Sequence, residues 1–272
     1  MKKRERKRIN KKTIIDKIIT VIMLTIYLGG QICLFLFEKD VWEFLTNNKH
    51  SNLLSLEATL GYSILLTLIF VNINMLRQHN INNILRKKCD PQEYYERFLG
   101  LYLYANKYAR TQNKMSCDFL SGDWDSACKQ CFDVLQHSNN LALIQNAYTI
   151  MMQIYVVQGD NDNLNALRNS LMRLNVPTKK GAVFASLLDS ANVFADYLSG
   201  NAEDMIDKYS ALLPSCKFES DKNMVKFYLA LALTRAGRVV EAIPLFEDVI
   251  KNANKLFVVE WSKKFLLAVI SN

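Results

Sequence analysis

The chain has 272 residues, enough for one or two domains; half of them are hydrophobic, and the formal net charge at pH 7 is +8. The basic excess lies in residues 1–12 and 77–90, whereas the chain from residue 91 onward carries 19 basic and 19 acidic residues. Since this excess borders apolar stretches, we expect contact with lipid headgroups and no nucleic-acid partner. The six cysteines form no short, dense disulfide framework, which favours a reducing compartment.

Two long uncharged stretches predict membrane-spanning helices. Residues 18–37 and 58–76 contain no charged side chain, and a helix of about twenty residues covers about 30 Å, the thickness of the hydrocarbon core. A cleaved signal peptide is the main alternative for the first stretch. Signal cores are shorter, about 7–15 residues, and no small-residue cleavage site follows this one. We therefore expect an uncleaved transmembrane hairpin over residues 13–76.

The basic residues beside these stretches predict the orientation of the hairpin. Residues 1–12 carry eight Lys or Arg and residues 77–90 carry four, whereas the loop over residues 38–52 has only Lys39 and Lys49. Because cytoplasmic flanks are enriched in Lys and Arg, we expect the N-terminus and the C-terminal domain in the cytoplasm and the loop outside. The chain would then be a multi-pass protein of the cell membrane. Frequent Asn, Lys and Ile suggest an AT-rich bacterial genome.

A polar linker over residues 77–90 is expected to join the hairpin to a helical domain over residues 91–272. The start of this domain is well marked in the sequence. Asp90 can cap a helix, Pro91 suits the first helical position and Glu93 can complete a capping box.

One pattern recurs along the helical domain. A glycine follows a helical stretch and precedes another, at Gly122, Gly159, Gly200 and Gly237, with spacings of 37, 41 and 37 residues. Glycine readily adopts the left-handed conformation that ends a helix. Apolar residues recur at matching offsets after each glycine and lie on one helical face; in the last unit they are Ala242, Phe246, Val249 and Ile250.

The best unit, residues 228–250, resembles a tetratricopeptide repeat (TPR). The match consists of Ala230, Gly237, Ala242 and Phe246. The resemblance covers about residues 107–272 and implies an α-solenoid of about four helix–turn–helix repeats, in which neighbouring units stack to bury their apolar faces. The expected fold is therefore all-α: a two-helix transmembrane hairpin followed by a TPR-like solenoid. Residues 256–270 would form a terminal helix that covers the open end.

Motifs for catalysis or metal binding are not evident, so we expect neither an enzyme nor a cofactor. Cys128 and Cys131 form a C-x-x-C pair, but no second pair stands at a suitable distance, and structural zinc takes four ligands. Cys131 falls on the apolar face of its repeat, which favours ordinary packing. The three histidines, His50, His79 and His137, have no ligand spacing.

The TPR resemblance implies that the domain binds another protein. Solenoids of this family hold an extended segment or a helix in a concave groove, so candidate partner-binding residues come from the first helix of each unit: Asn113, Tyr148, Asn192 and Lys226. We expect a membrane-anchored scaffold or adaptor for a protein partner. One alternative is a structural subunit of a larger membrane complex assembled through its spans, by oligomerisation or with other chains. Another is a sensor or enzyme whose site no motif reveals.

Overall fold

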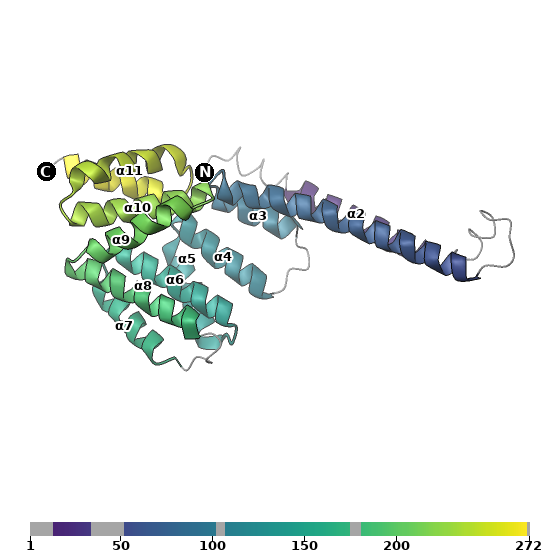
Figure 1. The fold of residues 1–272 in the computed structure, drawn as a ribbon, viewed down its shortest axis with the longest axis horizontal. Helices are drawn as coiled ribbons and strands as arrows, with labels where there is room; N and C mark the ends of the chain where they lie inside the picture. Colours follow the sequence, from purple (N-terminus) through teal and green to yellow (C-terminus); the bar gives the residue numbers. More distant parts are fainter. Residues whose placement is uncertain (1–12, 34–51, 102–106, 175–180, 271–272) are drawn as a thin grey trace. The chain divides into compact units, whose positions relative to one another are not determined.

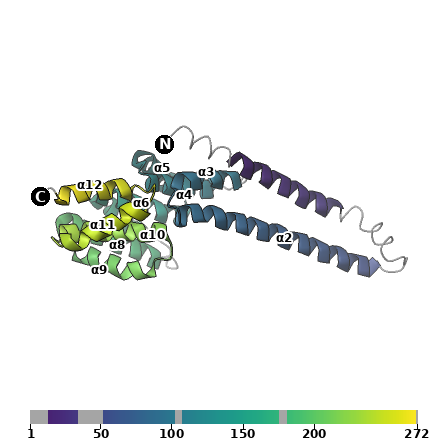
Figure 2. The same ribbon diagram turned by 90° about the horizontal axis from the view of Figure 1, so that it is seen from above.

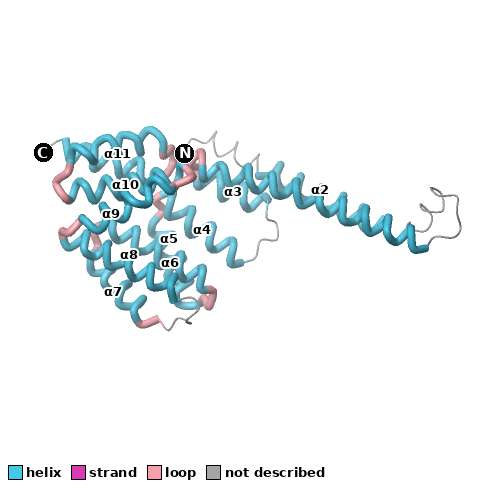
Figure 3. Tube along the Cα trace, in the orientation of Figure 1, coloured by secondary structure: helices cyan, strands magenta, loops and turns pink. Residues whose placement is uncertain are grey.

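The computed structural model describes residues 13–33, 52–101, 107–174 and 181–270. These residues form α-helices and one short 3-10 helix, and no strand occurs among them (Figures 1 and 3). The all-α prediction is thus confirmed for the described part of the chain. The described residues divide into two compact units. The first unit contains the helices up to Asn82 and the residues from Glu96 to Leu101. The second unit contains Asn83–Tyr95 and the helices from Lys107 onward.

The first unit contains two long helices that lie side by side, the Thr13–Cys33 helix and α2 (Asn52–Arg86) (Figure 2). The Thr13–Cys33 helix and the Leu60–Arg86 part of α2 are long and apolar enough to cross a membrane. Residues 34–37 of the first predicted span, the outer loop up to residue 51 and the basic residues 1–12 lie outside the described residues. Helix α2 continues to Arg86, so most of the segment expected as a polar linker is helical.

Helix α3 (Pro91–Leu101) begins where the sequence predicts a helix start. Asp90 caps it, because the Glu93 backbone N–H donates to the Asp90 carboxylate at 3.0 Å. The residue before the cap, Cys89, is fully buried and has a φ of 52° in the left-handed region, which turns the chain sharply between α2 and α3.

The second unit contains four helix pairs and a last helix. Within this unit each helix packs against the next, and α4 also contacts α6, α6 contacts α8, and α10 contacts α12. The elements in chain order are α4 (Lys107–Ser121), α5 (Trp124–His137), α6 (Leu141–Gln158), α7 (Asn161–Met172), α8 (Gly181–Ser199), α9 (Glu203–Leu212), the 3-10 helix η2 (Leu213–Ser215), α10 (Glu219–Arg235), α11 (Val239–Asn252) and α12 (Val258–Ile270).

The recurring glycines separate the two helices of each pair. All four have a positive φ, namely 83° at Gly122, 74° at Gly159, 108° at Gly200 and 75° at Gly237. The prediction of left-handed turns is therefore confirmed at every unit. A side chain would be strained at these angles, which explains why glycine stands there.

Helices α6 and α10 lie at the centre of this unit rather than on its surface. Ten of the 18 residues of α6 are buried, and nine of the 17 residues of α10 are buried. A helix that is apolar on most sides must be surrounded by other helices. The first helices of these two pairs therefore contribute mainly to the hydrophobic core, and only a few of their side chains are exposed.

The C-terminal segment returns to the first helix pair. The Phe257 backbone N–H donates to the Leu120 carbonyl at 2.8 Å, and the Phe257 ring lies 5.1 Å from Phe119. Trp261 stacks on Trp124 of α5 at 5.3 Å. Helix α12 packs on α10 and α11, as expected of a terminal helix, but the segment before it also joins the last pair to the first.

Candidate functional site

The first unit carries its aliphatic side chains on the outside. Large apolar residues of both long helices are strongly exposed; examples are Ile26 at 67%, Leu76 at 65% and Ile64 at 60%. Contiguous apolar surface of this kind is unfavourable in water, where single exposed residues are ordinary but large patches are rare. Its even distribution along both helices is typical of a surface that faces lipid.

Polar side chains of the two helices face each other. The Ser63 hydroxyl donates to the Gln31 side-chain oxygen at 2.7 Å, and the hydroxyls of Tyr27 and Thr67 are 3.2 Å apart. Membrane helices associate partly through such contacts between hydroxyl and amide groups. We call these four residues the polar seam. The hairpin thus has polar contacts between its two helices and aliphatic side chains on its outer surface.

A cluster of charged side chains lies at the end of the hairpin where the first helix begins. Asp16 is only 7% exposed, and the Arg97 guanidinium donates to both of its carboxylate oxygens, at 2.7 and 3.2 Å. Arg77 donates to the Asp16 carbonyl at 2.8 Å and to the Thr20 hydroxyl at 2.9 Å. A Cβ on Gly100 would lie 3.0 Å from the Thr13 carbonyl, so the end of α3 packs closely on the start of the first helix.

The four candidate partner-binding residues differ in their contacts and exposure. Asn113 accepts a hydrogen bond from the Tyr94 hydroxyl at 2.7 Å, and Lys226 forms an ion pair with Asp248 of α11. Tyr148 is 2% exposed. Only Asn192 is exposed among the four.

The position of α6 explains the burial of Tyr148. Because α6 lies at the centre of the second unit, most of its side chains pack internally. The Tyr148 hydroxyl pairs with Ser170 of α7 at 2.9 Å, so even its polar end is used inside the domain.

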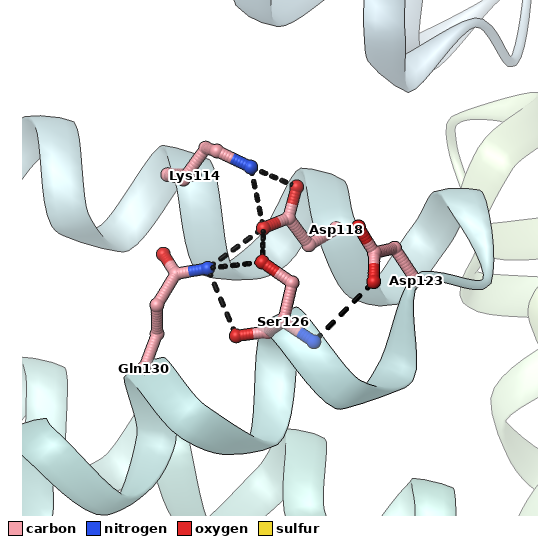
Figure 4. Close-up of polar contacts among 5 residues, drawn as sticks. All are labelled: Lys114, Asp118, Asp123, Ser126 and Gln130. Carbon is pink, nitrogen blue, oxygen red and sulfur yellow. Dashed lines mark hydrogen bonds and ion pairs between the residues drawn. The ribbon is translucent and has the colours of Figure 1, made fainter.

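A buried carboxylate joins α4 to α5 (Figure 4). Asp118 is 8% exposed and accepts hydrogen bonds from Lys114, from the Ser126 hydroxyl at 2.7 Å and from Gln130 at 2.7 Å. The next turn is fixed by Asp123, which accepts from the Ser126 backbone N–H. Sequence reasoning missed this cluster, although the i, i+4 spacing of Lys114 and Asp118 is a local signal for an ion pair.

The donors around Asp118 define what it can do chemically. Lys114 contacts both carboxylate oxygens, whereas Ser126 and Gln130 both donate to Oδ2. The carboxylate therefore ties α4 to α5 through side-chain hydrogen bonds from both helices. It fixes the first helix pair, which the C-terminal segment contacts.

The C-x-x-C pair lies in the second unit on α5. Cys131 is fully buried, and burial raises the pKa of its thiol to about 12. Burial also raises the pKa of the Cys128 thiol above its ordinary value. Thiols that resist ionisation are poor nucleophiles and poor metal ligands. Among the described residues, no three His, Cys, Asp or Glu side chains are arranged to hold a metal ion.

Comparison with known proteins gives limited guidance. No family model and no solved structure matches the chain. The chain is 28% identical over 101 residues to the "Uncharacterized protein ycf55" of Pyropia yezoensis, a match that covers 35% of this chain and 31% of that protein. The chain thus spans about a third of the length of this relative.

Proposed function

We propose that the chain is a membrane-anchored scaffold or adaptor, with the hairpin in the bilayer and the helical domain bound to a partner protein. The observation that carries this proposal is the hairpin, which has aliphatic side chains on its outer surface and polar contacts between its helices. Its exposed aliphatic residues and internal polar seam suit a lipid environment and not water. The basic residues that flank the spans support an orientation with both termini in the cytoplasm.

The order of helix contacts in the second unit supports a TPR-like stacking of its four pairs. The first helices of successive pairs touch, α4 with α6 and α6 with α8, and Phe194 of α8 lies 6.2 Å from Tyr228 of α10. Stacking of one pair on the next is how repeat domains bury their apolar faces.

The outer faces of the domain are the better candidates for partner contact. Phe132 on α5 is 48% exposed and Val240 on α11 is 84% exposed. Exposed aromatic and aliphatic side chains can anchor a protein interface when a partner covers them. The partner is thus proposed to dock on the second helices of the pairs, and not in a groove along the first helices.

A photo-crosslinking experiment on the full-length protein in cells tests this function. A crosslinking amino acid replaces Phe132 or Val240, and a matched control places it at Asp162, a polar exposed residue of α7. A discrete crosslinked protein is expected from Phe132 or Val240 and not from Asp162. Failure to obtain any product from the two apolar positions would argue against an adaptor that uses these faces.

A structural subunit of a larger membrane complex is the second candidate. The extent of exposed aliphatic surface on both long helices favours it, because other spans could pack there. The same crosslinker at Ile64, which is 60% exposed on α2, distinguishes the two. Protein crosslinks from Ile64 alone would favour the complex subunit, and crosslinks from Phe132 alone would favour the adaptor.

A further inference from the structure

An open apolar groove runs along the outside of the hairpin. It has a volume of about 160 Å³ and lies between the two long helices, away from the helix ends. The lining residues are Met23, Ile26, Tyr27, Leu66, Ile69, Phe70 and Ile73. Such a groove on helices that face lipid matches the hydrocarbon chain of a lipid in both chemistry and position.

A guanidinium group stands at one end of this groove. Arg77 follows Ile73 by one helical turn, so the two residues share a face of α2. The Arg77 Nη1 atom lies 3.7 Å from the sulfur of Met23, which itself lines the groove. The sequence places Arg77 directly after the predicted end of the second span, at the depth of the headgroups.

Among the residues that the structure describes, no carboxylate is bonded to Arg77. Its hydrogen bonds go to the Asp16 carbonyl, the Thr20 hydroxyl and the Met23 sulfur, which are all neutral acceptors. The Asp16 carboxylate is held instead by Arg97 through both oxygens. The three charged side chains joined by these described hydrogen bonds, Asp16, Arg77 and Arg97, therefore sum to +1, which favours an anion beside Arg77.

We propose that this groove binds an anionic glycerophospholipid, with an acyl chain along the apolar wall and the phosphate at Arg77. The inference rests on the proposed insertion of the hairpin in the bilayer. Arginine pairs well with phosphate through charge-assisted hydrogen bonds. A second copy of the chain is a poorer occupant, because two-fold packing on this groove would bring two clusters of charge +1 together.

Lipid retention by the purified full-length protein tests the proposal. The protein is extracted in a neutral detergent, mixed with phosphatidylglycerol or phosphatidylcholine, and examined by native mass spectrometry. Phosphatidylglycerol is expected to bind more tightly by about five-fold, the contribution of one basic residue at an anionic surface. Arg77→Gln is expected to weaken binding of phosphatidylglycerol by about five-fold while leaving binding of phosphatidylcholine unchanged.

Two matched controls separate the groove from general effects. Lys17→Gln removes a charge from an exposed residue next to Asp16 and is expected to keep the lipid preference. Ile26→Trp fills the groove and is expected to lower binding of both lipids. Ile22→Trp changes a residue that is 51% exposed on the same helix but does not line the groove, and should leave binding unchanged.

Several outcomes would overturn the proposal. Equal binding of the two lipids would show that the groove has no preference for an anionic lipid. Equal losses of phosphatidylglycerol binding in Arg77→Gln and Lys17→Gln would show that the preference comes from general electrostatics. A dimer that disappears in Ile26→Trp would assign the groove to a second copy. If the protein stays in the membrane fraction and still crosslinks to its partner, these failures leave the proposed function intact.

Discussion

Gly122 combines a backbone requirement with a packing requirement. Its φ is 83°, and a Cβ built on it would lie 3.2 Å from the Cβ of Phe257. Gly159 has a similar φ of 74°, but a Cβ there would meet nothing within 4 Å. Substitution at Gly159 would therefore strain only the turn. Substitution at Gly122 would strain the turn and also disturb the contact between the first helix pair and the C-terminal segment.

We expect Gly122→Ala to destabilise the protein more than Gly159→Ala. Both substitutions place alanine in the left-handed region, which lowers the free energy of unfolding by about 1–2 kcal/mol. Only Gly122→Ala adds overpacking against Phe257, at about 1–3 kcal/mol. Urea unfolding of the two variants measures the difference. An equal loss of unfolding free energy in the two variants would mean that Phe257 moves away from residue 122 without destabilising the protein.

The buried thiols of α4 and α5 predict a loss of stability in alkali. Burial raises the pKa of Cys117 and of Cys131 to about 12, above the ordinary value of 9.0. Since the folded state favours the neutral thiol, this contribution is complete below pH 9 and is lost as the pH rises from about 9 to about 12.

The free energy of unfolding should therefore fall by about 1–2 kcal/mol per thiol between pH 9 and pH 10.5, and urea titrations at the two pH values measure it. Cys131→Ala removes one titrating group and should show a smaller fall, although it also loses packing at both pH values. An identical fall in Cys131→Ala and in the parent protein would exclude Cys131 as a source.

At the scale of elements, the segment before α3 belongs to the helical domain. The Lys255 backbone N–H donates to the Cys89 carbonyl at 3.2 Å, and its ammonium group pairs with Asp90 at 2.8 Å. Asn254 donates to the Lys88 carbonyl at 2.6 Å. These contacts connect residues more than 160 positions apart, so the domain extends upstream of residue 91.

A soluble fragment of residues 83–272 should accordingly be more stable than one of residues 91–272. The shorter fragment lacks the three contacts of Lys255 and Asn254 and should lose roughly 3–6 kcal/mol, at about 1–2 kcal/mol for each of these polar contacts. Thermal and urea unfolding of the two fragments test this. Asp90→Ala in the longer fragment is expected to lose part of that stability, and no difference between the fragments would show that the segment contributes nothing.

The polar seam predicts a measurable coupling between the two long helices. Gln31→Leu and Ser63→Ala each remove one side of the hydrogen bond at 2.7 Å. A double-mutant cycle in micelles should give a coupling of about 0.6 kcal/mol, the average for such bonds in membrane proteins. Within the described part of the hairpin, Thr25 bonds to the Val21 carbonyl of its own helix and not to α2, so Thr25→Val with Ser63→Ala should be additive. Coupling in the control pair would point to a general effect of repacking.

At the scale of the whole molecule, membrane insertion and orientation are testable together. The full-length protein should stay in the pellet after a carbonate wash, because it has two helices that are long and apolar enough to cross a membrane. Protease added to intact cells should leave the C-terminal domain uncut, and permeabilised cells should lose it. Release by carbonate would contradict the anchor, while digestion in intact cells would contradict only the orientation.

The sequence by itself determined the features that depend on local chemistry. Apolar stretches of bilayer length predicted two long helices, and the recurring glycines predicted the turns because few other residues tolerate a left-handed backbone. Asp90 predicted the start of α3 for the same kind of reason, since a helix cap is a contact between residues three positions apart.

Only the tertiary structure decided which faces are buried. Tyr148 was a candidate for partner contact, yet α6 lies at the centre of its unit and the residue is 2% exposed. The bonds that Asp118 accepts from Ser126 and Gln130, and the contact of Phe257 with Leu120, depend on how separate helices pack. Side-chain periodicity shows that a helix has an apolar face but not how many neighbours surround it, because that number is set by long-range packing.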